Sequence, residues 1–523
     1  MRCERYCCPL DSRTKNSARN IVAGFVSRGV SVLMPFITRT VLISTLGMSY
    51  VGLNSLFASI LGVLNLAELG VGTALVFSMY EPFERGDTEK ICALLLLYKR
   101  CYRIIGCAVL GAGLVLLPFL RHLVHGDLPD GISLYALYGI HLANAVLGYF
   151  LFAYKQSLFI ASQRNDVVSN VGAALAFASS ALQITLLVTF QNFYLYALVL
   201  PAITIANNIC ISYLAKRKFP DIASRGIVDK DTRASIKKNV MGLMVQKLGV
   251  AMLTSVDGLI ISAFLGVELL GIYNNYYLIV TSLIGFLSVI QVGMTASVGN
   301  SLVSKSIEEN YWDFRKFNFI SIWVITWWTA CYVCLIQPFI TLWLGSDALL
   351  PLTVAALLGA YFYSKTMSTM VVVYREASGL WKEGMFVPLI AAVVLALLNI
   401  AFIRPLGIAG PPLSTVICMF MVYLPFYSIV LFRHYFKDLS RWRSYLCSQL
   451  LHAGVAAFIS VVTLALCSFI PDGGMFPFIV KLVIAAIVPN VLLFVLFGRT
   501  GSFLRSREFV IAHFISRNGG KHE

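Results

Sequence analysis

The sequence predicts an all-α polytopic membrane protein of about fourteen transmembrane helices, with two pseudo-symmetric six-helix halves and a C-terminal helix pair. The first observation behind this prediction is composition: 58% of the 523 residues are hydrophobic and 13% are charged. Soluble domains hold about 45–50% apolar and about 25% charged residues. The apolar residues also come in runs of about 18 or more, long enough to cross a bilayer as helices. The other two observations are the placement of the charges and an internal repeat.

Fourteen apolar runs are separated by charged residues or by Gly/Pro breaks. Several are longer than the roughly 20 residues that one crossing needs, which indicates tilt or extension beyond the membrane. The predicted spans are residues 20–45, 50–80, 91–119, 132–160, 167–190, 193–215, 238–264, 269–302, 317–344, 349–374, 384–403, 407–432, 444–470 and 476–498.

The lysines and arginines predict the orientation of these spans. Alternate connections and the adjoining helix ends hold 35 of the 41 Lys and Arg residues, a bias that marks the cytoplasmic side. The first twenty residues contain no apolar signal segment, so the N-terminus is expected in the cytoplasm. With an even number of spans the C-terminus is expected there too. The net charge of +16 is therefore read as a topology signal, and no nucleic-acid partner is expected.

The internal repeat has an offset of 219 residues. "NIVAGFVSR" (20–28) aligns with "NVMGLMVQK" (239–247), and "LGMSYVGL" (46–53) aligns with "LGVELLGI" (265–272). Halves with an even number of spans insert in the same orientation, so their two-fold axis runs along the membrane normal. The predicted organisation is a cytoplasmic N-terminal tail (1–19), a first half (20–215), a basic cytoplasmic linker (216–237), a second half (238–432), a helix pair (433–498) and a basic amphipathic cytoplasmic tail (499–523). The tail is expected to lie on the inner leaflet, with its apolar face toward lipid: Phe503, Leu504, Val510, Ile511 and Phe514.

Several classes of function are disfavoured. The sequence contains no G-x-x-x-x-G-K-[ST] motif, so an ATP-driven motor is not expected. The outward loops are short, which argues against a membrane glycosyltransferase or another enzyme. Cys3, Cys7 and Cys8 lack a partner at zinc spacing, so no metal site is expected. No cofactor is expected beyond a coupling proton or sodium ion.

Cations inside the predicted spans are the candidate substrate-binding residues. Arg28 and Arg39 are eleven residues apart, which is three turns plus about 20°, so they share one face of the first span. The repeat places Lys247 at the position equivalent to Arg28. Each side chain can instead reach a membrane interface. A cation at matching places in both halves favours a central cavity that they share.

Glu68 and Asp257 are the candidate ion-coupling or counter-ion residues. Glu68 lies near the middle of the second span, in a glycine-spaced stretch that shows no other charge from Tyr50 onwards. The glycines at 62, 70 and 72 are interpreted as sites of close helix packing, not as a binding loop. A carboxylate at this depth must face a cavity or find a partner. It can be a counter-ion to the face of Arg28 and Arg39, a protonatable coupling group or a structural partner. Asp257 can carry the same task.

His141 and Asn144 lie in the fourth predicted span, and both are expected to be interhelical hydrogen-bond partners instead of ligands.

Two stretches carry a family resemblance. "YVGLNSLFASILGVLNLAELGVGTALVFSMYEPFERGDTEKICALLLLYKRCYRIIG" (50–106) and "YREASGLWKEGMFVPLI" (374–390) resemble the Wzx-type polysaccharide flippases. That family belongs to the multidrug/oligosaccharidyl-lipid/polysaccharide exporter superfamily. The resemblance covers the whole chain in its architecture of twelve helices in two halves followed by an extra pair.

The resemblance implies a function. Such a protein moves an undecaprenyl-pyrophosphate-linked oligosaccharide across the bacterial plasma membrane by ion-coupled alternating access around a cationic cavity. It serves surface polysaccharide biosynthesis, with a glycan polymerase and export machinery as partners. Within the superfamily, a lipid II flippase or a drug/cation antiporter are the alternatives. An antiporter usually has twelve spans and a more acidic cavity, and both the extra pair and the cations count against it.

Overall fold

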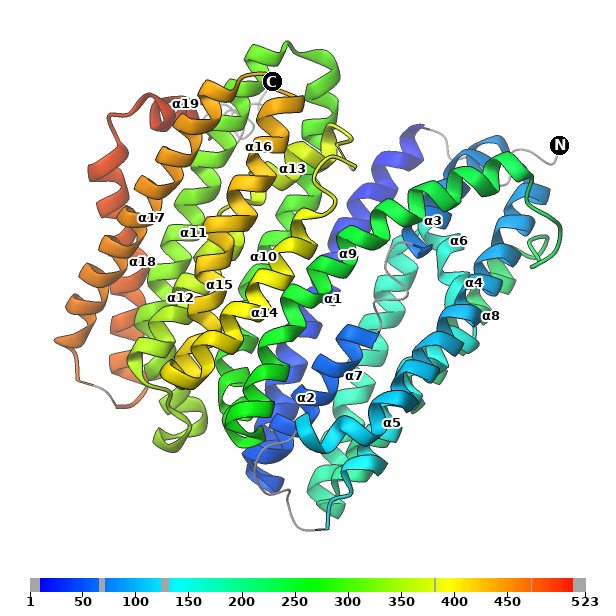
Figure 1. Cartoon of the computed structure of the whole chain (residues 1–523), viewed down its shortest axis with the longest axis horizontal. Coiled ribbons are helices and arrows are strands. Elements are labelled where there is room, and N and C mark those ends of the chain that lie inside the picture. Colours follow the sequence, from blue (N-terminus) through cyan, green and yellow to red (C-terminus); the bar gives the residue numbers. More distant parts are fainter. Residues whose placement is uncertain (1–9, 65–70, 124–130, 381, 472, 511–523) are drawn as a thin grey trace, which may run out of the picture. The chain divides into compact units, whose positions relative to one another are not determined.

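The computed structural model describes residues 10–64, 71–123, 131–380, 382–471 and 473–510, and some side chains within these ranges are left out. The regular elements in these ranges are helices (Figure 1). They are α1 (Leu10–Leu46), α2 (Met48–Leu64), α3 (Val71–Arg85), α4 (Thr88–Leu116), η3 (Leu117–Leu123), α5 (Leu134–Phe150), η4 (Ala153–Lys155), α6 (Gln156–Ala161), α7 (Asn165–Phe190), α8 (Phe193–Lys218), α9 (Lys230–Leu265), α10 (Val267–Ser304), α11 (Ile307–Leu344), η5 (Ser346–Ala348), α12 (Leu352–Thr366), α13 (Thr369–Ala377), α14 (Val387–Leu406), η6 (Gly407–Ala409), α15 (Gly410–Cys418), η7 (Met419–Tyr423), α16 (Leu424–His434), α17 (Leu439–Ser468), α18 (Met475–Phe497) and α19 (Gly501–Val510).

The protein is a polytopic helical membrane protein, as predicted. Ten described helical segments are long and apolar enough to cross a membrane, and the pair α5–α6, bent by 50°, makes eleven. The three other predicted spans do not appear as separate long helices, because each is interrupted or joined to its neighbour. Residues 50–80 are split between α2 and α3, residues 349–374 break between α12 and α13, and α14 and α15 run in opposite directions on either side of Gly407 within one long apolar segment (Figure 1). Fourteen spans stays a prediction.

The chain divides into two compact units. Unit 1 comprises Met1–Asn274 with Pro388–Ala396, and unit 2 comprises Asn275–Val387 with Leu397–Glu523. This division falls inside α10, whereas the predicted halves meet at the linker 216–237, so α9 packs with unit 1. The two-half organisation stays a prediction, because compact units reflect the density of contacts and the repeat reflects sequence similarity.

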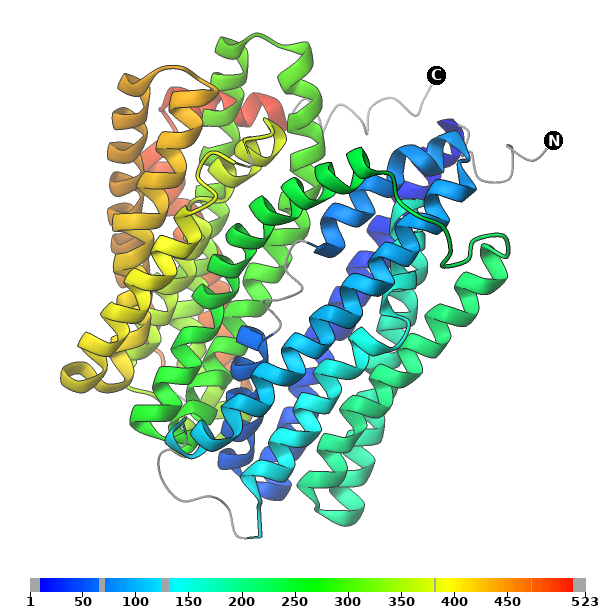
Figure 2. The same cartoon turned by 45° about the vertical axis from the view of Figure 1, so that its right-hand side comes forward.

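Unit 1 is held by helix pairs with polar contacts between them. α1 packs along α7, and α4, α5 and α8 run side by side (Figure 2). The Thr204 hydroxyl of α8 donates to the Asn144 side-chain oxygen of α5 at 2.6 Å, which confirms the role expected for Asn144 as an interhelical partner. The same role is expected for His141. Its buried Nε2 has no hydrogen-bond partner among the described residues, and its ring instead packs 5.0 Å from that of Phe57.

Unit 2 is built around α11, on which α12, α17 and α18 pack. The C-terminal pair is joined to α11 by an apolar cluster of Ala330, Ile459 and Leu493 and by a hydrogen bond from the Trp323 indole to Asn490 at 2.8 Å. The short α19 then packs on α11 as well.

The tail prediction is wrong for Phe503. Its ring lies 5.6 Å from the rings of both Trp323 and Phe494, because α19 turns back onto α11 and α18. Leu504 is exposed, as expected of a lipid-facing residue. The side chain of Val510, together with Ile511 and Phe514, lies outside the described residues.

The repeat is visible in the backbone where paired helices meet. Gly47 joins α1 to α2 with φ +105°, and Gly266 joins α9 to α10 with φ +95°. The two glycines are 219 residues apart, so they are equivalent in the repeat. Glycine adopts this left-handed region without the steric cost that a β-carbon brings.

A reciprocal contact follows these two joints. A β-carbon on Gly52 would overlap the carbonyl oxygen of Val267, and one on Gly271 would lie 2.6 Å from the carbonyl oxygen of Met48. Gly52 is equivalent to Gly271 in the repeat, and Met48 is equivalent to Val267. Each glycine therefore contacts the residue that is equivalent to its partner's contact. A two-fold axis between the two copies of the motif requires this reciprocity.

This close approach predicts which glycine substitutions destabilise the protein. Gly271→Ala should lower the free energy of unfolding by about 1–3 kcal/mol, because the new methyl group forces two helix backbones apart. Gly111→Ala is the matched control in α4, since its β-carbon would meet nothing within 4 Å. Thermal unfolding of the purified variants should show a lower midpoint for Gly271→Ala alone. Equal midpoints for both variants would mean that α2 and α10 are not in contact there.

Candidate functional site

Arg39 lies on α1 within the apolar segment Gly29–Leu46. Its side chain is half-buried, and its Nη1 donates a hydrogen bond of 2.7 Å to the backbone carbonyl of Asn274 on α10. A guanidinium has five N–H donors, so it can contact several acceptors at once. Arg39 therefore contacts α10 at Asn274, three residues after Gly271 of the reciprocal glycine contact.

Lys247 lies on α9, near the start of the apolar segment Met244–Leu265. Its Nζ donates a hydrogen bond of 2.7 Å to the hydroxyl of Thr73 at the start of α3. The side chain is half-buried. Thr73 is five residues after Glu68 in the sequence. Lys247 on α9 therefore contacts α3, the helix that follows Glu68 in the chain.

The remaining candidates are only partly described. Asp257 is buried on α9, with 5% of its surface exposed. Arg28 lies on α1, but its side chain is outside the description, and Glu68 lies outside the described residues altogether. The structure thus places all three of Arg39, Lys247 and Asp257 in unit 1, the first on α1 and the other two on α9.

The predicted packing glycines around this site behave as expected. A β-carbon on Gly62 would lie 2.6 Å from the Ser255 hydroxyl of α9, and one on Gly72 would lie 2.6 Å from the Tyr98 hydroxyl of α4. Both glycines let neighbouring helices approach closely, which confirms their interpretation as packing residues. Gly70 lies outside the described residues.

Sequence reasoning missed a buried cation in unit 2. Arg375 lies on α13 with 1% of its surface exposed, and its guanidinium carbon is 4.5 Å from the centre of the Tyr427 ring. Nη1 makes one long hydrogen bond of 3.3 Å to the carbonyl of Leu380, while Nε and Nη2 have no partner among the described residues. Nor does any described carboxylate lie within ion-pair distance of this arginine. The position was overlooked because it was read as part of a cytoplasmic connection.

The local fold explains how an arginine is held there. Tyr427 on α16 stacks on Tyr423 with ring centres 4.5 Å apart, and Tyr423 ends the π-helical segment η7. π-helical turns inside α-helices are frequent at functional sites, because they shift the following side chains out of the regular register. A buried cation with unfilled donors in such surroundings is a candidate for binding an anion.

Comparison with known proteins defines the class of this fold. No family model matches the chain, and no curated protein matches its sequence. Solved structures that share its fold include transporters of the MOP superfamily and the lipid II flippase MurJ. The chain therefore has the MOP transporter fold.

Three of these structures show the extent of the match. The lipid II flippase MurJ, in an inward closed conformation, superposes with a TM-score of 0.62 at 15% identity, covering 91% of this chain and 98% of MurJ. A multidrug resistance MATE transporter in an inward-facing conformation gives a TM-score of 0.62 at 12% identity, covering 82% and 98%. A MOP transporter from Pyrococcus furiosus, described by the reverse polarity of its binding pocket, gives 0.53 at 14% identity, covering 84% and 96%.

The isolation of Arg375 leads to a prediction that separates function from stability. Arg375→Met should keep or raise the thermal midpoint, because exchanging a buried charge for an apolar side chain of similar length is often neutral or stabilising. The same variant should lose most transport activity. Tyr427→Phe is the control, since it keeps an aromatic ring beside the guanidinium. A clearly lower midpoint for Arg375→Met would show that the arginine is structural.

Proposed function

We propose that the chain is a flippase for an undecaprenyl-pyrophosphate-linked oligosaccharide in the bacterial plasma membrane, as its resemblance to Wzx-type flippases implies. The observation that carries the proposal is the pair of cations, Arg39 and Lys247, on apolar helices of unit 1. A diphosphate that crosses a bilayer needs cations to replace its water. A guanidinium binds phosphate oxygens in a bidentate way, and an ammonium adds a compact charge.

The MOP fold supports this proposal at the level of the superfamily. MurJ, whose structure covers more of this chain than the MATE transporter does, is named for flipping a lipid-linked substrate. That coverage is in line with a C-terminal helix pair beyond the twelve helices usual for a drug antiporter. The oligosaccharide-lipid substrate, the surface polysaccharide pathway, and a glycan polymerase and export machinery as partners are parts of the proposal. So is the orientation with both termini in the cytoplasm.

A leaflet-access assay tests the transported substrate. Purified protein is reconstituted in liposomes with a fluorescent lipid-linked oligosaccharide, and a membrane-impermeant reagent reports the fraction that has changed leaflet. The Arg39→Gln, Lys247→Gln double variant should lower the initial rate at least about tenfold, since each lost charge-assisted hydrogen bond weakens diphosphate binding. Lys216→Gln, Arg217→Gln is the matched control, because these two cations are exposed at the end of α8.

Two outcomes would contradict the proposal. A double variant that transports at the rate of the unmodified protein would remove the cations from the mechanism. A chain that exports a cationic dye and leaves the lipid-linked oligosaccharide unmoved would belong with the drug/cation antiporters.

Ion coupling is assigned to Glu68, with Asp257 as the second acid. Burial favours the neutral form of a carboxyl group and a nearby cation favours the anion, so two conformations can hold different protonation states. Glu68→Gln fixes a neutral group of the same size. It should still bind the lipid-linked oligosaccharide, and its transport rate should lose its dependence on pH. An unchanged pH profile in Glu68→Gln would move the coupling role to Asp257, which Asp257→Asn then tests in the same assay.

A further inference from the structure

Unit 2 contains a cavity that the proposed transport function does not use. It has a volume of about 470 Å³ and lies between the beginnings of α11 and α17, the end of α18 and α19. This is within the size range of small-molecule sites in proteins. Charged residues crowd the first turns of α11 and α17 and the chain after α18, so this end of the bundle is where the helices leave the apolar part of the membrane.

At the rim of the cavity, two arginines lie near the indole ring of one tryptophan. The guanidinium carbon of Arg505 lies 4.2 Å from the centre of the Trp312 ring, and that of Arg315 lies 5.7 Å from the same centre. Because both are measured to one ring, the two cations are at most about 10 Å apart. Like charges at this distance repel each other, and an anion between them removes the repulsion.

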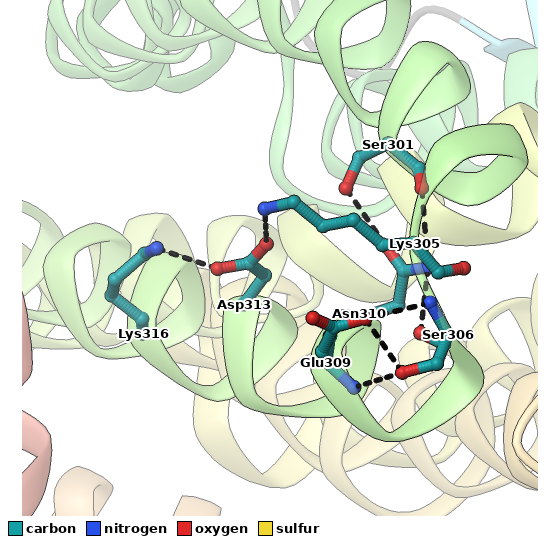
Figure 3. Close-up of polar contacts among 7 residues, drawn as sticks. All are labelled: Ser301, Lys305, Ser306, Glu309, Asn310, Asp313 and Lys316. Carbon is teal, nitrogen blue, oxygen red and sulfur yellow. Dashed lines mark hydrogen bonds and ion pairs between the residues drawn. The ribbon is translucent and has the colours of Figure 1, made fainter.

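Three other cations at this end of the bundle have carboxylate partners. Asp313 lies 2.6 Å from Lys305 and 2.6 Å from Lys316, so this acid is shared by two lysines (Figure 3). Arg441 pairs with Glu308 at 2.8 Å and with Asp438 at 3.0 Å. The Ser440 hydroxyl and the backbone N–H of Arg441 lower the pKa of Asp438, so it is an anion at neutral pH.

Arg315 and Arg505 line the cavity itself. No carboxylate of the described residues lies within ion-pair distance of either of them. Hydrogen bonds fix the start of α11, which carries Trp312 and Arg315. Ser306 and Glu309 form a capping box there (Figure 3). The Asn310 side-chain amide donates to the backbone carbonyls of Ser301, Lys305 and Ser306. These contacts hold the first turns of α11 in place, and with them the backbone that carries both cavity residues.

The inner wall of the cavity has polar side-chain atoms that make no hydrogen bond among the described residues. Tyr445 is buried, with 7% of its surface exposed, and its hydroxyl has no hydrogen-bond partner in the described part of the chain. Gln449, one turn further along α17, gives its amide to Asn318 at 3.1 Å. The Nδ1 of His452 is likewise buried and unbonded among the described residues. Aromatic rings, among them Phe314 and Phe319, form the rest of this wall.

We propose that this cavity binds the phosphate-bearing headgroup of an anionic membrane phospholipid, with Arg315 and Arg505 on the phosphate, and Trp312 and Tyr445 on the glycerol region. Guanidinium groups suit phosphate oxygens, and a membrane-facing site at a helix end suits a lipid more than a soluble anion. The aromatic inner wall matches the apolar part of such a molecule. The site lies wholly in unit 2 and does not depend on which substrate the protein transports.

Lipid-induced thermal stabilisation tests the site. Purified full-length protein in detergent is titrated with phosphatidylglycerol, and the thermal midpoint is followed, since a ligand that binds the folded state raises it. Arg315→Gln, Arg505→Gln should weaken the apparent affinity at least about tenfold. The matched control, Arg433→Gln, Arg443→Gln, removes two exposed arginines from the same end of the bundle outside the cavity lining, and it should bind as the unmodified protein does.

Tyr445→Phe separates a binding role from a structural one. Removing an unbonded buried hydroxyl is expected to leave the midpoint without lipid unchanged or higher. The same variant should weaken the affinity for phosphatidylglycerol a few-fold.

Four results would overturn the proposal. These are equal losses in the cavity and control double variants, unchanged affinity in Tyr445→Phe, equal stabilisation by zwitterionic phosphatidylcholine, and displacement of phosphatidylglycerol by inorganic phosphate at the same concentration. The last result would assign the cavity to a free phosphate instead of a lipid.

Discussion

In unit 1, α2 and α10 approach so closely at Gly52 and Gly271 that a β-carbon on either would meet backbone atoms of the other helix. The rest of the candidate site depends on this contact. The joints at Gly47 and Gly266 set the directions of α1 and α9 relative to α2 and α10, and they place Arg39 beside α10 and Gly258 beside α2. Small residues at such a crossing are typical of helix pairs in membranes, where close packing takes the place of the hydrophobic effect.

The symmetry of this scaffold is broken where the chemistry lies. Arg39 and Gly258 are equivalent in the repeat, but only Arg39 carries a charge. A β-carbon on Gly258 would lie 2.5 Å from the Ser59 hydroxyl, so a long side chain has no room at that position. Arg28 and Lys247 are the opposite case, because both halves keep a cation. A two-fold scaffold can thus present an uneven set of charges to a substrate that has no symmetry of its own.

Much of the fold and part of the site could be predicted from the sequence. Apolar runs and basic loops indicate the spans because a bilayer leaves a backbone few alternatives to a helix. The repeat led to Lys247, and the glycine spacing led to the packing at Gly62 and Gly72.

Other features depend on contacts between distant segments, and no local pattern shows them. Arg375 is buried because α16 places Tyr427 over it, yet its neighbours in sequence look like those of an exposed loop. Phe503 packs inward because α19 folds back onto α11 and α18. The cavity between α11, α17 and α19 joins residues almost two hundred positions apart.

We propose that cations on the apolar helices of unit 1 compensate the charge of a diphosphate. The most direct measurement is the dissociation constant of the purified protein for a polyprenyl diphosphate and for the matching monophosphate, by native mass spectrometry. Charge compensation predicts at least about tenfold tighter binding of the diphosphate. It also predicts that the difference disappears when Arg39 and Lys247 are both neutral. Equal affinity for the two lipids in the unmodified protein would contradict the claim.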